Sequence, residues 1–576
     1  MGCIREYKLP TVLTLIFMVC EAAIEAFIPF ITVELVNSLQ HPDGVEMLSI
    51  IKIGLLLVLM ACLSLSCGGL AGFTCAKASA GFAKNLRHDI FRRIQTYSFE
   101  NVDKFSSTSL VTRMTTDVSN VQMSYMMVIR TAVRSPLMFV FSIVMAYIMG
   151  GALATTFVVV VPFLIVGLVI VSRKAMPAFR RAFKKYDKLN ESIEENVRGM
   201  RVVKGFSREE HEKKKFHSAA EDIRVDFTRA ERIVALNSPI MQICLNFNMV
   251  FVLLVGSKMI VTGEGGIYVG QISAMLTYGM HILMSLMMLS MIYVMITMSM
   301  ESMKRVYEVL TEEPALTNPE NAVTEVRDGS VEFKDVSFKY SKTAEKNALF
   351  DIDLKIESGM TVGILGGTGS SKSTLVQLIP RLYDVSEGSV KVGGVDVREY
   401  DLDTLRGAVA MVLQKNLLFS GTIKENLRWG NKDATDEELT EACKLAQADE
   451  FIRSFPDGYD TMIEQGGTNV SGGQKQRLCI ARALLKKPKI LILDDSTSAV
   501  DTKTDMLIRN GFRSYIPETT KIIIAQRVAS VQDADMIIVM DNGKISAVGT
   551  HGELLASSDI YREVYSQQTG GGEGNE

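Results

Sequence analysis

The sequence predicts two joined folds: an α-helical domain that crosses a membrane six times, and an α/β domain built around a glycine-rich loop. Three observations support this fold class. Apolar residues, 47% of the 576-residue chain, crowd into its first half. A Gly-rich turn separates an apolar strand from a helix near Lys372, and a second apolar run, Ile490–Leu493, ends in Asp494 and Asp495. The net charge of −3, without a basic run interleaved with aromatic residues, argues against a nucleic-acid-binding protein.

Six stretches of the first half are long and apolar enough to cross a bilayer, which takes about 20 mainly apolar residues in a helix. They are Pro10–Leu39, Leu48–Ala78, Met126–Met149, Ala152–Val171, Ala235–Val261 and Ile267–Met298. Short turns follow the first, third and fifth stretches, whereas the second and fourth are followed by long segments rich in Lys and Arg. The positive-inside bias therefore predicts that these long segments, both termini and the second half lie in the cytoplasm of a cell.

The two long charged segments, Ser79–Tyr125 and Ser172–Ile233, have apolar residues at helical spacing and little Pro. They are predicted to extend the spanning helices into the cytoplasm. Each contains a short break, near Phe99–Phe105 and near Gly199–Phe206. We expect these breaks to lie crosswise on another domain.

Composition changes at Thr311, after which the chain resembles a soluble α/β protein. Val331–Tyr340 and Met360–Gly366 are predicted strands, and a helix is predicted to begin at Ser371 or Lys372. The predicted domains are a membrane domain over residues 1–310, a linker over 311–328, an α/β domain over 329–568 and a disordered tail over 569–576.

The glycine-rich loop nearly matches the G-x-x-x-x-G-K-[ST] pattern that cradles nucleotide phosphates with backbone N–H groups. Its residues are Gly366, Gly367, Thr368, Gly369, Ser370, Ser371, Lys372 and Ser373, followed by Thr374. Lys372 is expected on the outer phosphates and the Ser373 hydroxyl on Mg²⁺. Ser371 departs from the pattern, which has Gly there so that the backbone can approach phosphate. The sequence therefore predicts an ATP site with altered affinity.

Further residues make the chain resemble the ATP-binding cassette (ABC) transporters, in their exporter-type half-transporter form. Ser471, Gly472, Gly473 and Gln474 resemble the family's signature motif, and Tyr340 matches the aromatic residue that stacks on adenine. The resemblance also assigns Gln414 to sensing Mg²⁺ and the membrane domain, Asp494 to Mg²⁺, and Ser498–Asp501 to a loop that reaches across a dimer. It implies a type IV exporter-like membrane domain fused to a P-loop nucleotide-binding domain. It also implies two cassettes that sandwich two ATP molecules, each between one chain's phosphate loop and the other chain's signature.

Two catalytic positions depart from the family pattern together. Asp495 stands where the family has the Glu base, and Gln526 replaces the His that contacts the γ-phosphate. Asp is one methylene shorter than Glu, and a base must come within about 3 Å of the proton that it takes. Gln cannot carry the positive charge of an imidazolium. The chain therefore resembles the degenerate-site chain of heterodimeric bacterial multidrug-type exporters, whose partner chain supplies the complete catalytic residues.

Polar and sulfur-containing side chains inside the predicted spans are candidates for a substrate pathway. Glu21 and Glu25 lie one helical turn apart. A carboxylate within a membrane raises the free energy of the folded protein unless it is paired or hydrated. These two residues would attract a cationic substrate or form structural hydrogen bonds. Arg130 and Arg134 are expected to snorkel toward headgroups. The sixth span has a methionine face that would accept apolar shapes or serve helix packing, with Met284, Met288, Met291 and Met295 as the pathway candidates.

The sequence thus favours ATP-driven export of an amphipathic or hydrophobic drug, lipid or peptide, by a multi-pass protein of a bacterial cell membrane that uses ATP and Mg²⁺. The partner would be a second, catalytically complete half-transporter. Alternatives are a homodimeric exporter, an importer with an exporter-like fold, and an ATP-gated channel or regulatory membrane subunit. Turnover by the chain alone, the direction of transport in vesicles, and current without stoichiometric turnover would distinguish them.

Overall fold

The computed structural model describes the chain except for residues 1, 40–46, 264–265, 342–344, 496–500 and 570–576. The chain divides into two compact units. The first combines Met1–Gln95 with Ser106–Glu312, and the second combines Thr96–Phe105 with Glu313–Glu576. The division near residue 312 lies close to the expected end of the membrane domain. The expected tail over 569–576 lies outside the described residues except for Thr569, which ends the last helix.

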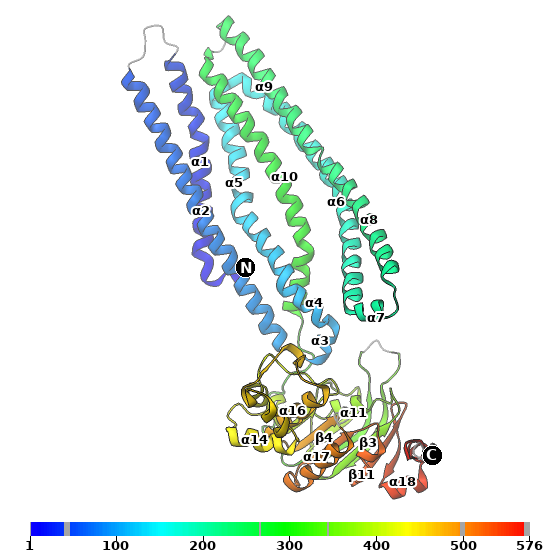
Figure 1. The fold of residues 1–576 in the computed structure, drawn as a ribbon. Helices are drawn as coiled ribbons and strands as arrows, with labels where there is room; N and C mark the ends of the chain where they lie inside the picture. The colour runs from blue at the N-terminus through cyan, green and yellow to red at the C-terminus, as the bar shows by residue number, and fades with distance from the viewer. Residues whose placement is uncertain (1, 40–46, 264–265, 342–344, 496–500, 570–576) are drawn as a thin grey trace. The chain divides into compact units, whose positions relative to one another are not determined.

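The first unit consists of long helices that run side by side (Figure 1). Their bounds are η1 Gly2–Tyr7, α1 Lys8–Ser38, α2 Met47–Gln95, α4 Ser107–Thr112, η2 Arg113–Asp117, α5 Val118–Gly150, η3 Gly151–Thr155, α6 Thr156–Arg198, α7 Met200–Gly205, α8 Glu209–Val234, α9 Asn237–Thr262 and α10 Val269–Thr311. Five continuous helical stretches in the described part of the chain are long and apolar enough to cross a membrane. The third and fourth predicted spans share the stretch Ser107–Arg198, in which Gly151, with φ at 47°, begins η3 directly after the end of α5.

Buried side chains from α1, α5, α9 and α10 form an apolar cluster in the first unit. It includes Met145, Val252, Met275 and Ile282, all nearly inaccessible to solvent. The hydroxyl of Tyr278 donates a hydrogen bond of 2.9 Å to the carbonyl oxygen of Ala26 on α1. Since a polar group in an apolar interior is costly unless it is hydrogen-bonded, this bond fixes α10 against α1.

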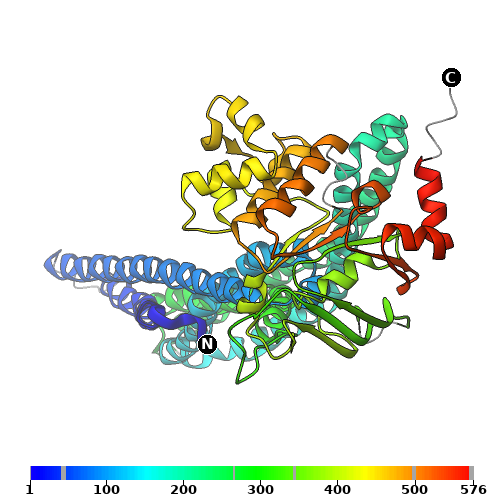
Figure 2. The same cartoon turned by 90° about the horizontal axis from the view of Figure 1, so that it is seen from below.

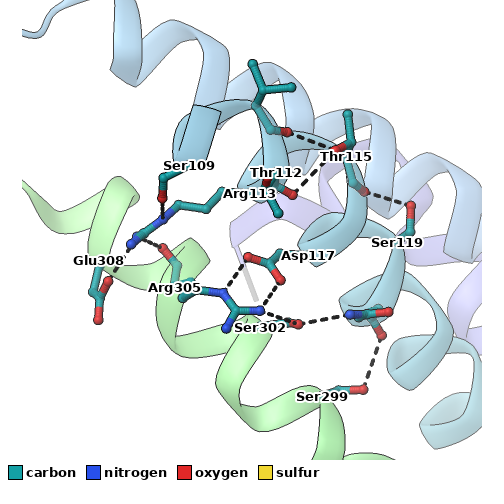
Figure 3. A network of polar contacts seen from close by, with 12 residues as sticks. Ser109, Thr112, Arg113, Thr115, Asp117, Ser119, Ser299, Ser302, Arg305 and Glu308 are labelled. Atoms are coloured by element: carbon teal, nitrogen blue, oxygen red, sulfur yellow. Dashed lines mark hydrogen bonds and ion pairs between the residues drawn. The ribbon is translucent and has the colours of Figure 1, made fainter. Parts of the chain in front are cut away.

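A polar network joins the charged ends of α5 and α10 (Figure 3). Arg305 of α10 donates two hydrogen bonds, of 2.7 and 2.5 Å, to the carboxylate of Asp117, which is fully buried. Arg113 donates to the carbonyl oxygen of Arg305 at 2.5 Å and to Glu308 at 2.9 Å. Arg113 and Asp117 bound the π-helical turn η2. This local widening of the helix, which is often found at functional positions, aims both side chains at α10.

The second unit is organised around a six-stranded sheet with the order β12-β11-β3-β10-β9-β6, in which only the edge strand β12 is antiparallel. The strands are β3 Thr361–Gly366, β6 Val409–Val412, β9 Ile490–Asp494, β10 Thr520–Ile524, β11 Met536–Asp541 and β12 Lys544–Gly549. An antiparallel sheet with the order β2-β1-β4-β5 is formed by β1 Val331–Phe338, β2 Leu349–Ile356, β4 Glu387–Val392 and β5 Val395–Asp396. A small hairpin pairs β7 Gly421–Thr422 with β8 Met462–Ile463.

Alternating residues of the central strands face two different cores. On β9, Ile490 and Ile492 pack with the antiparallel sheet and α11, whereas Leu491 and Leu493 pack with the helices. The helices are α11 Lys372–Gln377, α12 Leu402–Ala408, α13 Ile423–Arg428, α14 Asp436–Leu445, α15 Asp449–Ser454, α16 Gly472–Leu485, α17 Thr502–Tyr515, α18 His551–Ser557 and α19 Asp559–Thr569. Figure 2 shows the antiparallel strands and the helices around α14 on opposite sides of the central sheet. Burial on both faces explains the continuous apolar runs of these strands.

The breaks predicted in the two long charged segments are short helices. Phe99–Phe105 forms α3, and it groups with the second unit rather than with the helices that precede and follow it in the chain. The second break forms α7 within the first unit. Both breaks were expected to lie on another domain. The grouping of α3 with the second unit agrees with that expectation, and contact of α7 with another domain stays a prediction.

Candidate nucleotide-binding site

The phosphate-binding loop connects the end of β3 to the start of α11. Lys372, the first residue of α11, folds its ammonium back onto the loop and donates to the carbonyl oxygens of Gly366 at 2.9 Å and Gly367 at 2.7 Å. Burial lowers the pKa of Lys372, while the nearby Asp495 and Asp494 act in the opposite direction. The ammonium is thus held beside the loop by two carbonyl oxygens. When a phosphate binds, its oxygens would replace these carbonyl oxygens as the acceptors of the Lys372 hydrogen bonds.

Ser371 caps α11 with φ at 68° and ψ at 25°, which is the left-handed conformation. Residues with a Cβ adopt this conformation at a cost of roughly 1–2 kcal/mol, whereas Gly adopts it freely. The structure therefore gives a physical reason for the Gly that the sequence pattern has at this position. The loop keeps its shape in spite of the substitution, and the strain stays in its backbone.

Asp494 ends β9 beneath the loop and is 4% exposed. Its carboxylate accepts a hydrogen bond of 2.9 Å from the Ser373 hydroxyl. Burial, together with the neighbouring Asp495, raises the pKa of Asp494, and the bond from Ser373 opposes that rise. A hydroxyl and a buried carboxylate are the kind of oxygen ligands that Mg²⁺ takes together with phosphate oxygens and water. The residues present therefore fit the predicted Mg²⁺ site.

The two departures from the catalytic pattern touch each other. Gln526, just beyond β10, donates from its side-chain amide to Asp495 Oδ2 at 2.9 Å, and the amide of Gln414 lies 3.4 Å from the same oxygen. Asp495 itself has φ at 47°, and its N–H donates to the carbonyl oxygen of Ile524, which fixes the direction of its side chain. Strands β3, β6, β9 and β10 end at one edge of the sheet, where doubly wound folds bind their ligands.

Tyr340 lies two residues beyond β1, and its ring is half exposed. Its hydroxyl lies 2.8 Å from the hydroxyl of Thr374 on α11. The ring of Tyr383 packs edge-on against it, with ring centroids 5.3 Å apart. An exposed aromatic face next to the phosphate loop can stack on a nucleobase. The sequence did not single out Tyr383, because an aromatic residue in a loop shows its neighbours only after folding.

The signature residues form the start of α16. Ser471 is the N-cap: its hydroxyl accepts from the N–H of Gln474 at 3.3 Å, and the Gln474 side chain accepts from the N–H of Ser471 at 2.9 Å. This capping box leaves further N–H groups of the first turn, at Gly472 and Gly473, for an anion. The signature residues therefore present an ordered helix start that can receive a phosphate.

Asp501 caps α17 and accepts a hydrogen bond of 2.9 Å from the N–H of Thr504. Hydrogen bonds from Thr504 lower the pKa of Asp501. The preceding residues 498–500 of the predicted loop lie outside the described residues. The structure therefore accounts for Asp501 as a helix cap, and its role across a dimer stays a prediction.

The first unit contains a cavity of about 470 Å³ between α1, α5 and α10. Of the six pathway candidates, Glu25, Met284 and Met288 line it. Glu21 lies next to the cavity through its ion pair with Arg134, whereas Met291 and Met295 are not among the lining residues. Lining residues that the sequence analysis did not assign to the pathway include Arg134, Ser135, Met138, Met280 and His281.

Arg134 corrects one expectation. Instead of extending toward headgroups, it donates to Glu25 at 2.6 Å and lies 3.5 Å from Glu21. A charge within a spanning segment is stabilised by an opposite charge far more than by lipid, which explains the preference. Only the tertiary packing of α5 against α1 brings these residues together, since they are more than 100 positions apart in the chain.

Comparisons with known proteins agree with this fold. Residues 11–298 match the family model of the ABC transporter transmembrane region, and residues 349–498 match the ABC transporter model. An uncharacterized ABC transporter ATP-binding protein of Bacillus subtilis is 35% identical over 570 residues, covering 98% of each chain. A fatty acid ABC transporter ATP-binding/permease protein of Mycobacterium bovis is 33% identical over 479 residues, covering 83% of this chain and 75% of the relative.

A solved structure of a bacterial Atm1-family ABC exporter with ATP bound matches the fold with a TM-score of 0.85 and 24% identity, covering 100% of this chain and 99% of that chain. The two units described above thus have the architecture of a type IV exporter, a helical membrane domain fused to a nucleotide-binding domain. The chain therefore belongs to the ABC transporter family, and it uses ATP with Mg²⁺ to drive transport across a membrane.

Proposed function

We propose that the chain is one half of a heterodimeric exporter for amphipathic or hydrophobic compounds, and that its own ATP site binds ATP better than it cleaves it. The observation that supports this proposal most directly is the hydrogen bond from Gln526 to Asp495. Asp495 and Gln526, the two residues that depart from the catalytic pattern, are hydrogen-bonded to each other. A single substitution could be neutral, but a paired one replaces the base and the γ-phosphate contact together.

The chemistry of water activation explains the expected weakness of the site. When bound, Mg²⁺ neutralises charge on the phosphates, and Lys372 and Ser373 orient those phosphates. A general base must then take a proton from water held within about 3 Å of its carboxylate. Asp495 is short, and its Oδ2 accepts from Gln526 at 2.9 Å with the Gln414 amide close by. That oxygen is committed to amide donors, so ATP is held without an efficient base.

The signature at the start of α16 supports the other half of the proposal. Its four residues match the family motif, and their capping box presents an ordered helix N-terminus. Such a helix start favours a phosphate through its N–H groups and its dipole. In a heterodimer this surface would complete the partner's site, whose Glu and His carry most of the hydrolysis. Ser471→Ala should then damage the partner's site far more than this chain's own site.

The membrane cavity supports an amphipathic cargo. Its methionine side chains, Met138, Met280, Met284 and Met288, are flexible and polarizable, which suits apolar bodies of different shape. The ion pair of Glu25 and Arg134 supplies a polar end to the same cavity. A relative that is named a fatty acid transporter fits this class of cargo. We also infer that both termini and the nucleotide-binding domain are cytoplasmic, that the direction is outward, and that the protein is bacterial, as the named relatives are.

Purification of the tagged chain from its native membrane tests the heterodimer. We expect a stoichiometric second half-transporter with Glu and His at the positions of Asp495 and Gln526. The chain expressed alone should turn over ATP at a rate close to that of Lys372→Ala. Recovery of the chain only with copies of itself, together with brisk turnover, would identify a homodimeric exporter and reject the proposal.

Inside-out vesicles test direction and cargo. We expect ATP-dependent uptake of an amphipathic probe, either ethidium or a fluorescent fatty acid, and a lower rate for Glu25→Gln. Glu34→Gln is the matched control, since Glu34 is an exposed carboxylate on the same helix and does not line the cavity. Equal effects of the two variants would remove Glu25 from the pathway. Uptake in right-side-out vesicles would indicate an importer, and ion current without stoichiometric turnover a channel.

A further inference from the structure

The short helix α3, Phe99–Phe105, contacts an aromatic side chain of the nucleotide-binding unit, Tyr383. The hydroxyl of Tyr383 donates a hydrogen bond of 2.7 Å to the carboxylate of Asp103. The ring of Phe99 lies against the same tyrosine, with centroids 6.1 Å apart. Tyr383 thus contacts α3 with its hydroxyl and with its ring.

The other aromatic neighbours of Tyr383, Tyr340 and Phe338, lie at the nucleotide site. Its ring packs at 88° to that of Tyr340, with centroids 5.3 Å apart, and Phe338 packs against both tyrosines at 4.9 and 5.6 Å. The hydroxyl of Tyr340 lies 2.8 Å from that of Thr374, two residues after the phosphate-loop lysine. A continuous series of contacts therefore runs from the phosphate loop through Tyr340 and Tyr383 to α3.

Helix α3 is also attached to the segment that follows the membrane domain. The buried Asn101 donates to the carbonyl oxygen of Glu313 at 3.0 Å and accepts from the N–H of Ala315 at 3.0 Å. Arg381, two residues before Tyr383, donates to the carbonyl oxygen of Thr317 at 3.3 Å. The two bonds of Asn101 attach α3 to backbone groups far along the chain from the phosphate loop, whereas the bond to Tyr383 lies next to the predicted adenine contact. Tyr383 is therefore the contact that nucleotide binding can change.

We propose that Tyr383 is a positioning residue that transmits occupancy of the adenine face of Tyr340 to α3. A base stacked on Tyr340 fixes the orientation of that ring, and the edge-to-face contact then fixes Tyr383 and its bond to Asp103. Aromatic pairs favour such tilted geometries over others, so the orientation of one ring constrains the next. Because α2 ends at Gln95 and α4 begins at Ser107, α3 passes any displacement directly into two helices of the membrane domain.

This inference requires that adenine binds against Tyr340, and it is independent of whether the transporter is a heterodimer. It assigns to base binding, before any hydrolysis, a mechanical effect on the membrane domain. Phosphate binding alone would not produce the effect, because phosphate does not stack on the ring of Tyr340 and therefore leaves the orientation of that ring unfixed. Base and phosphate are therefore separable in an experiment.

Hydrogen–deuterium exchange on the full-length chain in nanodiscs, followed on peptides that contain residues 97–106, tests the proposal. We expect MgATP to slow exchange of α3 amides about three- to tenfold, and tripolyphosphate with Mg²⁺, which lacks a base, to leave it unchanged. Tyr383→Phe keeps the ring but removes the bond to Asp103, so it should abolish most of the ATP effect. Asp103→Ala removes the carboxylate that accepts this bond and should act alike.

Tyr459→Phe is the matched control. Tyr459 donates a hydrogen bond of 2.8 Å to Asp449 elsewhere in the same unit. Tyr459→Phe therefore removes the same kind of tyrosine–aspartate bond, but one that does not involve α3. This variant should keep the full ATP effect. The double variant of Tyr383→Phe and Asp103→Ala should be no worse than either single variant, since each removes the same bond.

Two outcomes would overturn the relay. One is full ATP-dependent protection of α3 in Tyr383→Phe, and the other is equal protection by tripolyphosphate and MgATP. ATP affinity, measured in parallel, separates this failure from failure of the adenine contact itself. Tyr340→Leu should weaken ATP binding about tenfold, as loss of one base–aromatic stack does. Unchanged affinity in Tyr340→Leu would place the base elsewhere and reject the proposed nucleotide contact.

Discussion

Replacement of Asp495 by Glu and of Gln526 by His should convert this chain's own ATP site into a hydrolytic one. The structure specifies why both changes are needed. Asp495→Glu moves the carboxylate forward by one methylene, about 1.5 Å of covalent reach. Gln526 still donates to the residue at position 495, so the longer base stays tethered. Gln526→His removes that amide and restores a group that can carry positive charge toward the γ-phosphate.

The size of the effect follows from two terms. A positioned general base contributes typically ~10²–10⁴-fold, which is roughly 3–5 kcal/mol of barrier at 1.36 kcal/mol per decade. A hydrogen bond from Gln526 to a charged carboxylate, 2.9 Å long, stabilises the unreactive arrangement by about 1.5–3 kcal/mol. Asp495→Glu alone therefore recovers only a part of the rate, on the order of tenfold, whereas the double variant should gain about 10²-fold or more.

The assay is steady-state ATP turnover by the chain expressed alone in nanodiscs, so that only sites of this type are present. Lys372→Ala, which removes the phosphate-loop ammonium, gives the background rate. We expect wild type near this background, Asp495→Glu above it, and the double variant well above both. Wild-type turnover near about 10 s⁻¹, the median for enzymes, would refute the reasoning. A double variant that stays at background, while it binds ATP normally, would show that the defect lies elsewhere in the site.

Three further predictions concern strain and buried charge. Ser371→Gly relieves a left-handed residue with a Cβ that is already strained without nucleotide, and should stabilise the nucleotide-binding unit by up to roughly 1–2 kcal/mol, seen as a higher unfolding temperature of the nucleotide-free protein. Asp117→Asn leaves Arg305 without its charged partner and should destabilise the helical unit by about 1.5–3 kcal/mol, seen as a lower unfolding temperature in nanodiscs. Asp494→Asn should weaken Mg²⁺-dependent binding of ATP at this site yet raise the unfolding temperature of the nucleotide-free protein at neutral pH. Burial raises the pKa of Asp494, so its ionised form opposes folding above the ordinary pKa of Asp, and removal of that charge stabilises.

The positions of the phosphate loop and of the acidic strand end could be predicted from the sequence because both are local. An apolar run followed by glycines, or by two acids, specifies a buried strand together with the turn at its carboxyl end. Strand order is not local: β9 and β10 are neighbours, and β10 lies between β9 and β3. The contact between Asp495 and Gln526 depends on that order. Each residue could therefore be identified from the sequence as a departure from the pattern, but their hydrogen bond could not be predicted.

The remaining surprises are contacts between distant segments. Arg134 meets Glu25 across two helices, and Tyr383 meets Asp103 across 280 positions. Single-residue rules describe what an isolated side chain prefers, such as an arginine that extends to headgroups. They do not describe a distant residue that tertiary packing brings into contact with that side chain. In both cases the charged or aromatic character was visible in the sequence, and the partner that decides its role was not.

Backbone strain and the two departures from the catalytic pattern together bear on the proposed role of this site. Ser371, the N-cap of α11, and Asp495, the residue after β9, both have positive φ, at 68° and 47°. Asp tolerates this conformation and Ser does so less readily, hence most of the strain lies in the phosphate loop. Strained residues persist where the surrounding structure enforces them, and such positions cluster at ligand sites. A fold that keeps the strained phosphate loop, with Asp495 and Gln526 at the two catalytic positions, fits the proposal that this site mainly binds ATP, and the bond of Tyr383 to α3 gives that binding a direct route to the membrane helices.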